Sequence, residues 1–302
     1  MPTKIVVAAG ALLIAGLAPT SPAHADHGSP GLARAGGAVT LGQVATTGAQ
    51  DCNPGPIAMA QYLEGGAPSY VTPTSGVITG YSVQAGTGAG SVRLVLFGPS
   101  ATAGHRTVVG LSALNPVVVS TVNTFATRIP VAAGVSIGLN NSASGMICWG
   151  AGGAGDQLKA VSGFDPDASS DFAPAATVNA ARVNISAVLE PDADGDLYGD
   201  VSQDLCPQSN LTQAACPAPD TTVTKAPKKS STHRKAKIKF VSTVAGSTFT
   251  CAVDGKAAVP CTSPFKKKYK YGKHKVLIAA ISPYGIVDAT PAKVKFKVVR
   301  PT

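Results

Sequence analysis

The amino-acid sequence predicts an all-β protein, and three observations lead to this prediction. The 302 residues include 33 glycines and 23 prolines, a composition that favours many turns over long helices. Its β-branched residues occur in short runs, bounded by clusters of glycine, proline, serine or asparagine. Several runs alternate apolar and polar residues, which is the period of a strand with one buried face. We therefore expect two separate β-sandwich regions joined by a short segment of another kind.

The N-terminal 25 residues are typical of a secretory signal peptide. Lys4 precedes the apolar run "IVVAAGALLIAGLA", which is too short to span a bilayer, and "AHA" at 23–25 fits a cleavage site between small residues. We therefore expect residues 1–25 to be removed and the mature chain to be secreted, with no transmembrane segment and at most a non-covalent association with the cell surface. Residues 26–48 are small, polar and glycine-rich, and we expect a flexible lead-in there.

Residues 49–190 contain five β-branched runs that we expect to form a jelly-roll-like sandwich or a related fold. The runs are 76–83, 90–97, 115–122, 134–140 and 182–189. In the second run, Val92, Leu94 and Leu96 alternate with Arg93, Val95 and Phe97. Such alternation predicts that one face of the strand meets the core and that the other face is partly available.

The charges divide the chain into two opposite parts. Residues 1–220 carry 7 lysines and arginines against 14 aspartates and glutamates, whereas residues 221–302 carry 18 against 2. The net charge of +9 conceals this division. In the basic part, "KAKIKF" (235–240) and "KVKFKVV" (293–299) each predict a strand with one lysine face and one apolar face. The pair Asp254–Gly255 predicts a hairpin turn.

Six cysteines in a secreted chain favour disulfides over free thiols or thiolate metal sites. Six cysteines allow fifteen connectivities, and the sequence alone does not choose among them. Their placement suggests the simplest set, in which each pair lies inside one predicted unit: Cys52 with Cys148, Cys206 with Cys216, and Cys251 with Cys261.

The stretch "PDADGDLYGDVSQDLCP" (191–207) combines many carboxylates with no nearby cation. Between Val183 and Thr224 the sequence has seven acidic residues and neither lysine nor arginine. Crowded carboxylates repel one another, and a divalent cation would relieve that repulsion. The spacing follows much of an EF-hand loop, with Asp192, Asp194, Asp196, the carbonyl of Tyr198 and Asp200 at positions 1, 3, 5, 7 and 9.

Two departures argue against an ordinary EF-hand in this loop. Leu197 stands where the sharp turn requires glycine, and Gln203 stands where a bidentate glutamate is expected. No flanking helix is predicted either. Calcium suits a flexible carboxylate loop better than magnesium, and zinc would need histidine or free thiolate ligands. A solvated acidic linker that binds no ion is the alternative interpretation.

The same stretch resembles a thrombospondin type 3 repeat over residues 190–216. In that family, spaced aspartates wrap calcium, and a cysteine near the end belongs to a neighbouring disulfide. The resemblance implies that Cys206 is the stapled cysteine and that five aspartates are side-chain ligands: Asp192, Asp194, Asp196, Asp200 and Asp204. Repeats of this family usually occur in long series, whereas this sequence has one. We expect residues 191–216 to form a calcium-binding connector.

The basic part resembles a bacterial immunoglobulin-like domain over most of residues 220–300. The resemblance rests on "TFTCAVDGKAAVPCTSPF" and the following "YGKHKVLIAAISPYGIVDATPAKVKFKV". It implies an immunoglobulin-like sandwich over 217–302, in which His274 has a role in the fold. The lysines of "KKKYKYGKHK" depart from the family, which usually has neutral polar residues there. They could hold an anionic cell-wall polymer, or they could be solvated faces that hinder aggregation.

No combination of residues in the sequence indicates catalysis. No nucleophile elbow, zincin motif or phosphate loop is present, and the five histidines do not form a recognisable site. We therefore expect a protein that is not an enzyme, acting at the cell surface or in a matrix in adhesion or display. The alternative is a carbohydrate-binding protein or a hydrolase, with a glycan or protein ligand bound by the N-terminal sandwich. Sixteen lysines against two arginines in 221–302 argue against specific recognition of nucleic acid.

Overall fold

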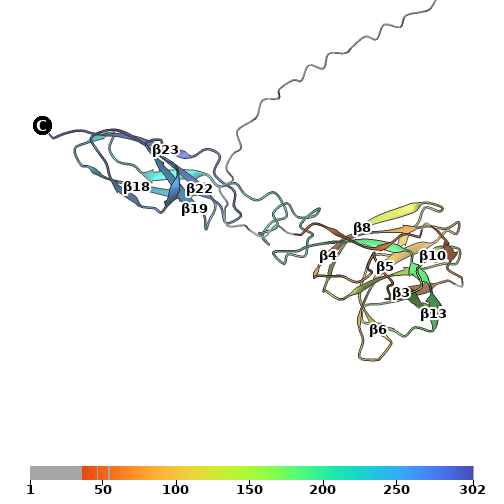
Figure 1. The fold of residues 1–302 in the computed structure, drawn as a ribbon. Coiled ribbons are helices and arrows are strands. Elements are labelled where there is room, and N and C mark those ends of the chain that lie inside the picture. The colour runs from red at the N-terminus through yellow and green to blue at the C-terminus, as the bar shows by residue number, and fades with distance from the viewer. Residues whose placement is uncertain (1–35, 46, 54, 302) are drawn as a thin grey trace, which may run out of the picture. The chain divides into compact units, whose positions relative to one another are not determined.

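The computed structural model describes residues 36–45, 47–53 and 55–301 of the chain. The predicted signal peptide (1–25) and the first part of the predicted lead-in lie outside the described residues. The described elements are all β-strands (Figure 1), which confirms the predicted fold class. The described part of the chain has no helix with the length and apolar character needed to cross a membrane.

The N-terminal sandwich is built from fifteen described strands. They are β1 (Val39–Gln43), β2 (Gln50–Asp51), β3 (Ile57–Leu63), β4 (Gly76–Gln84), β5 (Ser91–Pro99), β6 (Arg106–Leu111), β7 (Asn115–Pro116), β8 (Val122–Val131), β9 (Ser136–Asn141), β10 (Ile147–Ala151), β11 (Gln157–Ser162), β12 (Asp171–Phe172), β13 (Ala176–Asn179), β14 (Ala181–Val183) and β15 (Ile185–Glu190).

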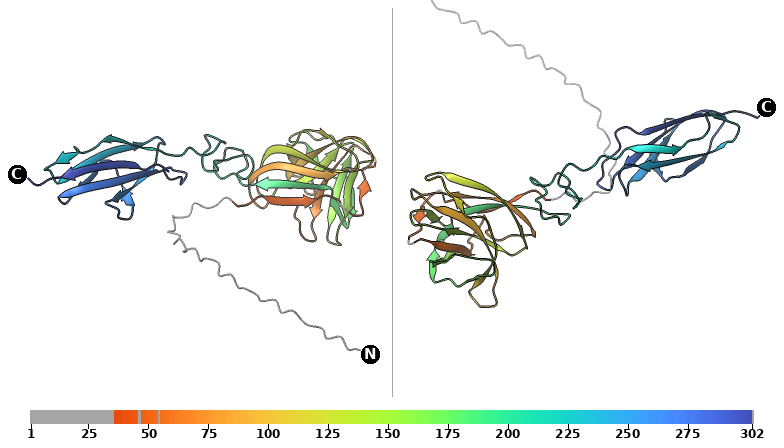
Figure 2. Two further views of the ribbon diagram at one scale, coloured as in Figure 1. Left: turned by 90° about the horizontal axis from the view of Figure 1, so that it is seen from above. Right: turned by 180° about the vertical axis from the view of Figure 1, so that it is seen from behind.

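These strands form two large sheets and one small sheet. The four-stranded sheet has the order β1-β15-β4-β8, and the larger sheet has the order β12-β6-β5-β9-β3-β11-β13 with β7 beside β5 (Figures 1 and 2). A three-stranded sheet has the order β14-β10-β2. The main core takes side chains from both large sheets, such as Ile78 and Leu189 from one and Leu94 and Ile137 from the other. The predicted two-sheet sandwich is therefore present.

The predicted strand 182–189 is divided between two sheets at Asn184. This side chain is fully buried, and its Oδ1 accepts hydrogen bonds from the backbone N–H groups of Ala45 (2.8 Å) and Gln84 (3.1 Å). Its Nδ2 donates to the carbonyls of Gln84 (2.7 Å) and Ile147 (2.8 Å). The amide thus satisfies backbone groups from three segments at the point where the chain leaves β14 and enters β15.

The second face of β5 is buried at Val95 and Phe97 and partly exposed at Arg93, which narrows the expectation that this face is partly available. Val92, Leu94 and Leu96 belong to the main core, as predicted. However, Val95 and Phe97 are also fully buried, in a second cluster that includes Phe172. The ring centroids of Phe97 and Phe172 lie 4.7 Å apart. The alternating pattern identified the two faces but could not show that a later segment covers the second one.

Two other predictions for this sandwich were wrong. The lead-in expected over 26–48 ends earlier, because β1 pairs antiparallel with β15 and buries Leu41. The strand expected over 115–122 ends at Pro116, and residues 117–121 form a turn before β8 begins at Val122. The side chain of Asn123 accepts from the N–H of Val118 (2.8 Å) and donates to its carbonyl (2.9 Å), and Ser120 has a left-handed φ of 60°. These side-chain hydrogen bonds satisfy the backbone locally in place of a strand partner.

The C-terminal sandwich consists of eight described strands in two sheets. They are β16 (Thr221–Lys225), β17 (Ser230–Ser231), β18 (Lys235–Ser242), β19 (Thr248–Val253), β20 (Val259–Cys261), β21 (Phe265–Lys268), β22 (Gly272–Ile281) and β23 (Ala292–Val298). The sheet orders are β16-β18-β21 and β17-β23-β22-β19-β20. In β18 and β23, exposed lysines alternate with buried apolar residues, as predicted. The buried residues belong to a core that shares no residue with the N-terminal cores.

The predicted hairpin turn at Asp254 and Gly255 joins β19 and β20. Both residues have left-handed φ values, 54° and 78°. A two-residue turn with positive φ at both positions matches the twist of the flanking strands, and the aspartate–glycine pair tolerates that conformation best. The two strands it connects are paired antiparallel.

The three disulfides are those suggested by the placement of the cysteines. Cys52 bonds to Cys148, Cys206 to Cys216 and Cys251 to Cys261, and no described cysteine is free. Trp149 packs against the core cluster that contains Cys52 and Cys148. Three disulfides indicate an oxidising, extracellular environment.

We expect the C-terminal sandwich to lose stability as the pH rises above 6.5 because of His274. Its Nδ1 lies 2.8 Å from Asp254 Oδ2, and its Nε2 lies 2.8 Å from the carbonyl of Lys270. Burial alone would lower the pKa of His274, but these hydrogen bonds outweigh burial and raise the pKa above its ordinary value of 6.5. The rings of Tyr269 and Phe296 enclose the imidazole. His274 therefore has a structural role.

A raised pKa means that the folded state binds the proton more tightly than the unfolded state. The stabilisation is complete below pH 6.5 and is lost as the pH rises through the higher folded value. Thermal unfolding of the full chain at several pH values would measure it. Asp254→Asn removes the negative charge beside His274, so this variant should show a flatter pH dependence. An unchanged pH dependence in the variant would contradict the assignment.

Candidate metal centre

The connector, residues 191–216, contains no described strand and begins directly after β15 (Figure 2). Glu190 ends that strand and is 2% exposed. Its Oε2 accepts the N–H groups of Val201 (2.9 Å) and Ser202 (2.8 Å), and its Oε1 accepts the hydroxyls of Ser202 (2.6 Å) and Thr79 (2.9 Å). Burial alone would raise the pKa of Glu190, but these hydrogen bonds lower it. Glu190 therefore holds the loop to β4 as a carboxylate.

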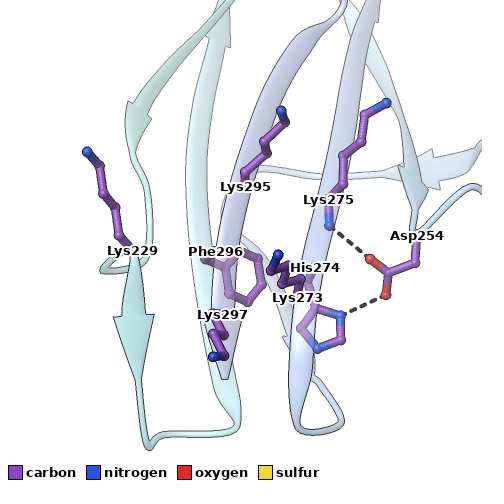
Figure 3. A pocket seen from close by; sticks show the side chains of 8 residues that line it. All are labelled: Lys229, Asp254, Lys273, His274, Lys275, Lys295, Phe296 and Lys297. Carbon is purple, nitrogen blue, oxygen red and sulfur yellow. Dashed lines mark hydrogen bonds and ion pairs between the residues drawn. The ribbon is translucent and has the colours of Figure 1, made fainter. Parts of the chain in front are cut away.

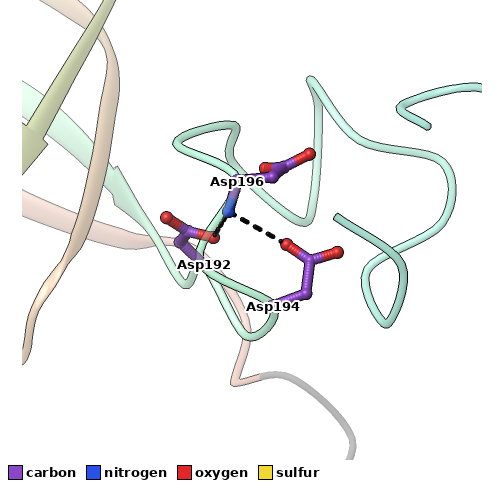
Figure 4. Close-up of side chains that lie close together, drawn as sticks. All are labelled: Asp192, Asp194 and Asp196. Carbon is purple, nitrogen blue, oxygen red and sulfur yellow. Dashed lines mark hydrogen bonds between the residues drawn. The ribbon is translucent and has the colours of Figure 1, made fainter. Parts of the chain in front are cut away.

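Asp192, Asp194 and Asp196 converge on one point of the loop. One carboxylate oxygen from each lies within 4.8 Å of the other two (Figure 4). The N–H of Asp196 donates to Asp192 Oδ1 (3.1 Å) and to Asp194 Oδ1 (3.2 Å). Alternate residues thus bring three carboxylates together because the loop backbone folds around them. This is the arrangement that the spacing predicted for positions 1, 3 and 5.

Asp200 and Asp204 are more deeply buried than the first three, with 8% and 2% exposure. Burial, together with the negative charges of Asp192, Asp194 and Asp204, raises the pKa of Asp200 to about 6. Burial also raises the pKa of Asp204, with added effects from Asp196, Asp194 and Asp192. These two carboxylates are close enough to interact with the other three, but they lie outside the group whose oxygens meet within 4.8 Å.

Two carboxylate oxygens of this loop are buried without any hydrogen-bond partner. They are Asp194 Oδ2 and Asp204 Oδ2. The other oxygen of Asp204 accepts the N–H of Cys206 (2.7 Å). An unpaired buried carboxylate oxygen costs free energy, so such atoms usually have a donor or a cation nearby. The donor set consists of oxygen atoms, which suits a hard divalent cation.

The structure shows what the two residues that depart from the EF-hand template do, and it adds Gln213 to the loop. Gln203, at the expected glutamate position, donates to the carbonyl of Thr127 (2.9 Å), and Gln213 donates to Asp196 Oδ2 (2.8 Å). Leu197 has a φ of 71°, so the position where the template requires glycine does adopt the left-handed conformation. Its side chain is 51% exposed. Leucine therefore bears a conformational cost there that glycine would not.

Arg128 is the cation that the sequence missed at this loop. Its guanidinium lies 3.9 Å from the centroid of the Tyr198 ring. It belongs to β8, seventy residues earlier in the chain, so a search of the neighbouring sequence could not find it. The contact is with the face of the aromatic ring, and no ion pair between Arg128 and the loop carboxylates is present among the described residues. The predicted ligand at Tyr198 is its backbone carbonyl.

Three carboxylates of the N-terminal sandwich lie against a basic side chain. Asp156 bonds to Arg182, Asp165 to Arg93, and His105 Nδ1 lies 2.7 Å from Asp171 Oδ2. Ser100 Oγ contacts Asp171 at 3.5 Å and not the imidazole, so aspartate stands between serine and histidine. A catalytic triad needs histidine in the middle to take the proton from serine. This cluster does not have that order.

No known protein-family model matches the chain, and no curated protein matches it. Among solved structures, the chain is similar to the glycoside hydrolase domain of Endo-D from Streptococcus pneumoniae R6, at 11% identity and a TM-score of 0.21 over 86% of this chain and 37% of that one. It is also similar to a beta-1,2-glucanase from Parabacteroides distasonis, at 10% identity and a TM-score of 0.22, over 87% and 39%. The chain thus spans less than half of either structure. Scores this low support no argument about fold or function.

Proposed function

We propose that this protein is a secreted, non-catalytic surface or matrix protein that acts in adhesion or display, and that calcium orders its connector. The observation that supports this most is the pair of buried, unpartnered oxygens on Asp194, which belongs to the converging group, and on Asp204 of the same loop. Five aspartates and the Tyr198 carbonyl would hold the ion: Asp192, Asp194, Asp196, Asp200 and Asp204. The resemblances to a thrombospondin type 3 repeat and to a bacterial immunoglobulin-like domain belong to this proposal.

Calcium would supply the positive charge that the loop lacks. Carboxylates that repel one another in its absence would become ligands, and the segment between the disulfide Cys206–Cys216 and β15 would become more rigid. Extracellular calcium modules bind with dissociation constants of about 0.1 to 1 mM. At a calcium concentration 100 times the dissociation constant, the bound state is stabilised by about 2.7 kcal/mol.

Isothermal calorimetry of the full chain with calcium tests the proposal. Proteolysis of the variant Asp204→Asn, compared with the parent protein in chelator and in calcium, is a second and more specific test. Asparagine keeps an oxygen for the N–H of Cys206 but removes one negative charge. In chelator, this variant should resist proteolysis of the connector better than the parent, because repulsion falls. In calcium, it should resist less well, because a ligand is lost.

Asp220→Asn is the matched control, since it removes the same charge from an exposed carboxylate outside the connector. It should leave the calcium response unchanged. Leu197→Gly should tighten calcium binding by relieving the left-handed leucine. The absence of heat at millimolar calcium, together with equal proteolysis in calcium and chelator, would contradict the calcium proposal. The connector would then be interpreted as an acidic linker that binds no ion.

A further inference from the structure

The exposed lysines of the C-terminal sandwich face one another across neighbouring strands. On β22 and β23, Lys273 is directly opposite Lys297, and Lys275 is directly opposite Lys295. Residues directly opposite each other point to the same face of a sheet, with Cβ atoms about 5 Å apart. Like charges in that position repel and destabilise the sheet. A sandwich with only structural requirements would not be expected to repeat the arrangement.

The second sheet repeats the pattern. Lys235 is opposite Lys268, and Lys237 is opposite Lys266 on β18 and β21. Each lysine face is also hollowed. Five lysines line a hollow of about 820 Å³ on the first sheet, together with Asp254, His274 and Phe296 (Figure 3). Five of the six residues that line a hollow of about 350 Å³ on the second sheet are lysines. Two separate surfaces of one sandwich therefore each have a cavity bordered by paired ammonium groups.

The two carboxylates of this sandwich do not neutralise these ammonium groups. Asp254 accepts hydrogen bonds from the His274 ring and from the backbone N–H of Lys275 (Figure 3). Asp288 is 3% exposed and accepts the N–H groups of Thr221 and Thr290. None of the ion pairs among the described residues includes a lysine. The positive charge is thus left for solvent ions or for an external polyanion.

Protection of sheet edges explains only part of the pattern. Lysines that hinder edge-to-edge aggregation belong on edge strands, and Lys266 and Lys268 lie on the edge strand β21. Lys275 on β22 is different, because its backbone N–H donates to the side chain of Asp254 and its carbonyl accepts the N–H of Asp254. The backbone of Lys275 is therefore not open to another chain, and edge protection does not account for its charge.

The spacing along each strand suits a linear polymer of phosphodiesters. Alternate residues of a strand lie about 6.8 Å apart on one face. A glycerol phosphate repeat has as many backbone atoms as two amino-acid residues, so its extended length is similar to this spacing. Successive phosphates could therefore meet successive lysines. Lysine acts as a point charge, which suits phosphates without a defined orientation.

We propose that the C-terminal sandwich binds a linear polyphosphodiester of the poly(glycerol phosphate) type along the lysine pairs of both sheets. A flat membrane would meet only one lysine face at a time, whereas a flexible polymer can follow both. The inference is independent of the calcium proposal, so the binding should persist in chelator.

The test is fluorescence anisotropy of the full chain with labelled synthetic poly(glycerol phosphate), starting at about 25 mM salt. Affinity should fall steeply with salt, with a slope of about 0.7 per contacting lysine, the value for single-stranded polyanions. Removing one opposed pair on the first sheet, with K275Q/K295Q, should reduce affinity about tenfold at low salt and the slope by about 1.4. The pair K237Q/K266Q on the second sheet should have a similar effect.

The control K256Q/K270Q removes the same charge from lysines that have no opposed partner, and it should change affinity less than about twofold. Thermal unfolding should show that the paired variants fold and melt at a higher temperature at low salt, because repulsion is removed. Four outcomes would overturn the proposal. Three are no binding at low salt, equal losses in all three variants, and tighter binding to anionic phosphatidylglycerol vesicles than to polymer. The fourth is tighter binding to single-stranded DNA that is lost in Tyr271→Ala, because this exposed ring is one on which bases could stack.

Discussion

Replacing both Cys52 and Cys148 with alanine is expected to lower the free energy of unfolding of the N-terminal sandwich by about 4 to 5 kcal/mol. This disulfide closes a loop with a sequence separation of 96 residues, so in the chain-entropy model it restricts the unfolded chain strongly. Both cysteines are almost completely buried in the main core. Alanine introduces no buried hydroxyl, and urea unfolding would measure the loss.

The control for this prediction is the pair Cys251→Ala and Cys261→Ala in the other sandwich. The two cysteines of this pair are only 10 residues apart in the sequence. The same model therefore gives a loss of unfolding free energy that is about 2 kcal/mol smaller than the loss for Cys52 and Cys148. Comparison with the parent protein in reducing agent separates the effect of the covalent bond from the effect of the side chains. Equal losses for the two pairs would contradict the loop-entropy explanation.

Arg182→Met is expected to cost the N-terminal sandwich about 3 to 5 kcal/mol. Arg182 is 6% exposed, and its Nε donates to Asp156 Oδ2 at 2.8 Å. Its other nitrogens donate to the carbonyls of Pro68 (3.0 Å) and Gly66 (2.7 Å). Without the guanidinium, the carboxylate of Asp156, which is 3% exposed, remains buried with no opposite charge.

The double variant Arg182→Met/Asp156→Asn should recover part of this loss, since no unpaired charge stays buried. Asp165→Asn is the control. It removes the exposed partner of the ion pair with Arg93, whose aspartate side chain is 84% exposed, and leaves the hydrogen bond from Arg93 to Asn140 in place, so the loss should be about 1 kcal/mol or less. Denaturant unfolding of the four proteins completes the comparison. A loss as small as that of Asp165→Asn would show that Arg182 does not compensate a buried charge.

Because of the Arg182–Asp156 pair, the N-terminal sandwich is also expected to lose stability at acidic pH. The hydrogen bond from Arg182 is the largest cause of the lowered pKa of Asp156, and the N–H groups of Gly65 and Gly153 add to it. A lowered carboxyl pKa gives stability that is complete above the ordinary value of 3.8 and is lost as the pH falls through the folded value.

Sequence patterns correctly predicted the strands, the turn and the loop geometry that a few neighbouring residues are enough to determine. The alternation in 235–240 and 293–299 identified the strands β18 and β23 and their buried faces. Asp254 and Gly255 predicted their turn because two adjacent residues suffice to favour it. The spacing of Asp192, Asp194 and Asp196 predicted their convergence for the same reason, since a short loop brings alternate residues together.

Sequence patterns did not predict the features that depend on contact with a segment far away in the chain. Nothing near β5 in the sequence shows that Phe172 covers its second face. Nothing near Leu41 shows that β15 will take β1 as a neighbour and turn part of the lead-in into sheet. The cation at the acidic loop, Arg128, comes from a strand far back in the chain.

The sequence by itself determined which residues alternate, which aspartates share a loop and which half of the chain is basic. Only the tertiary structure decided that Lys275 stands opposite Lys295 and that Asp204 is buried without a partner for one oxygen. The physical reason is that the direction of a side chain follows from the local backbone, with a period of two residues in a strand. Register and burial depend instead on strands far apart in the chain, which the hydrophobic core brings together.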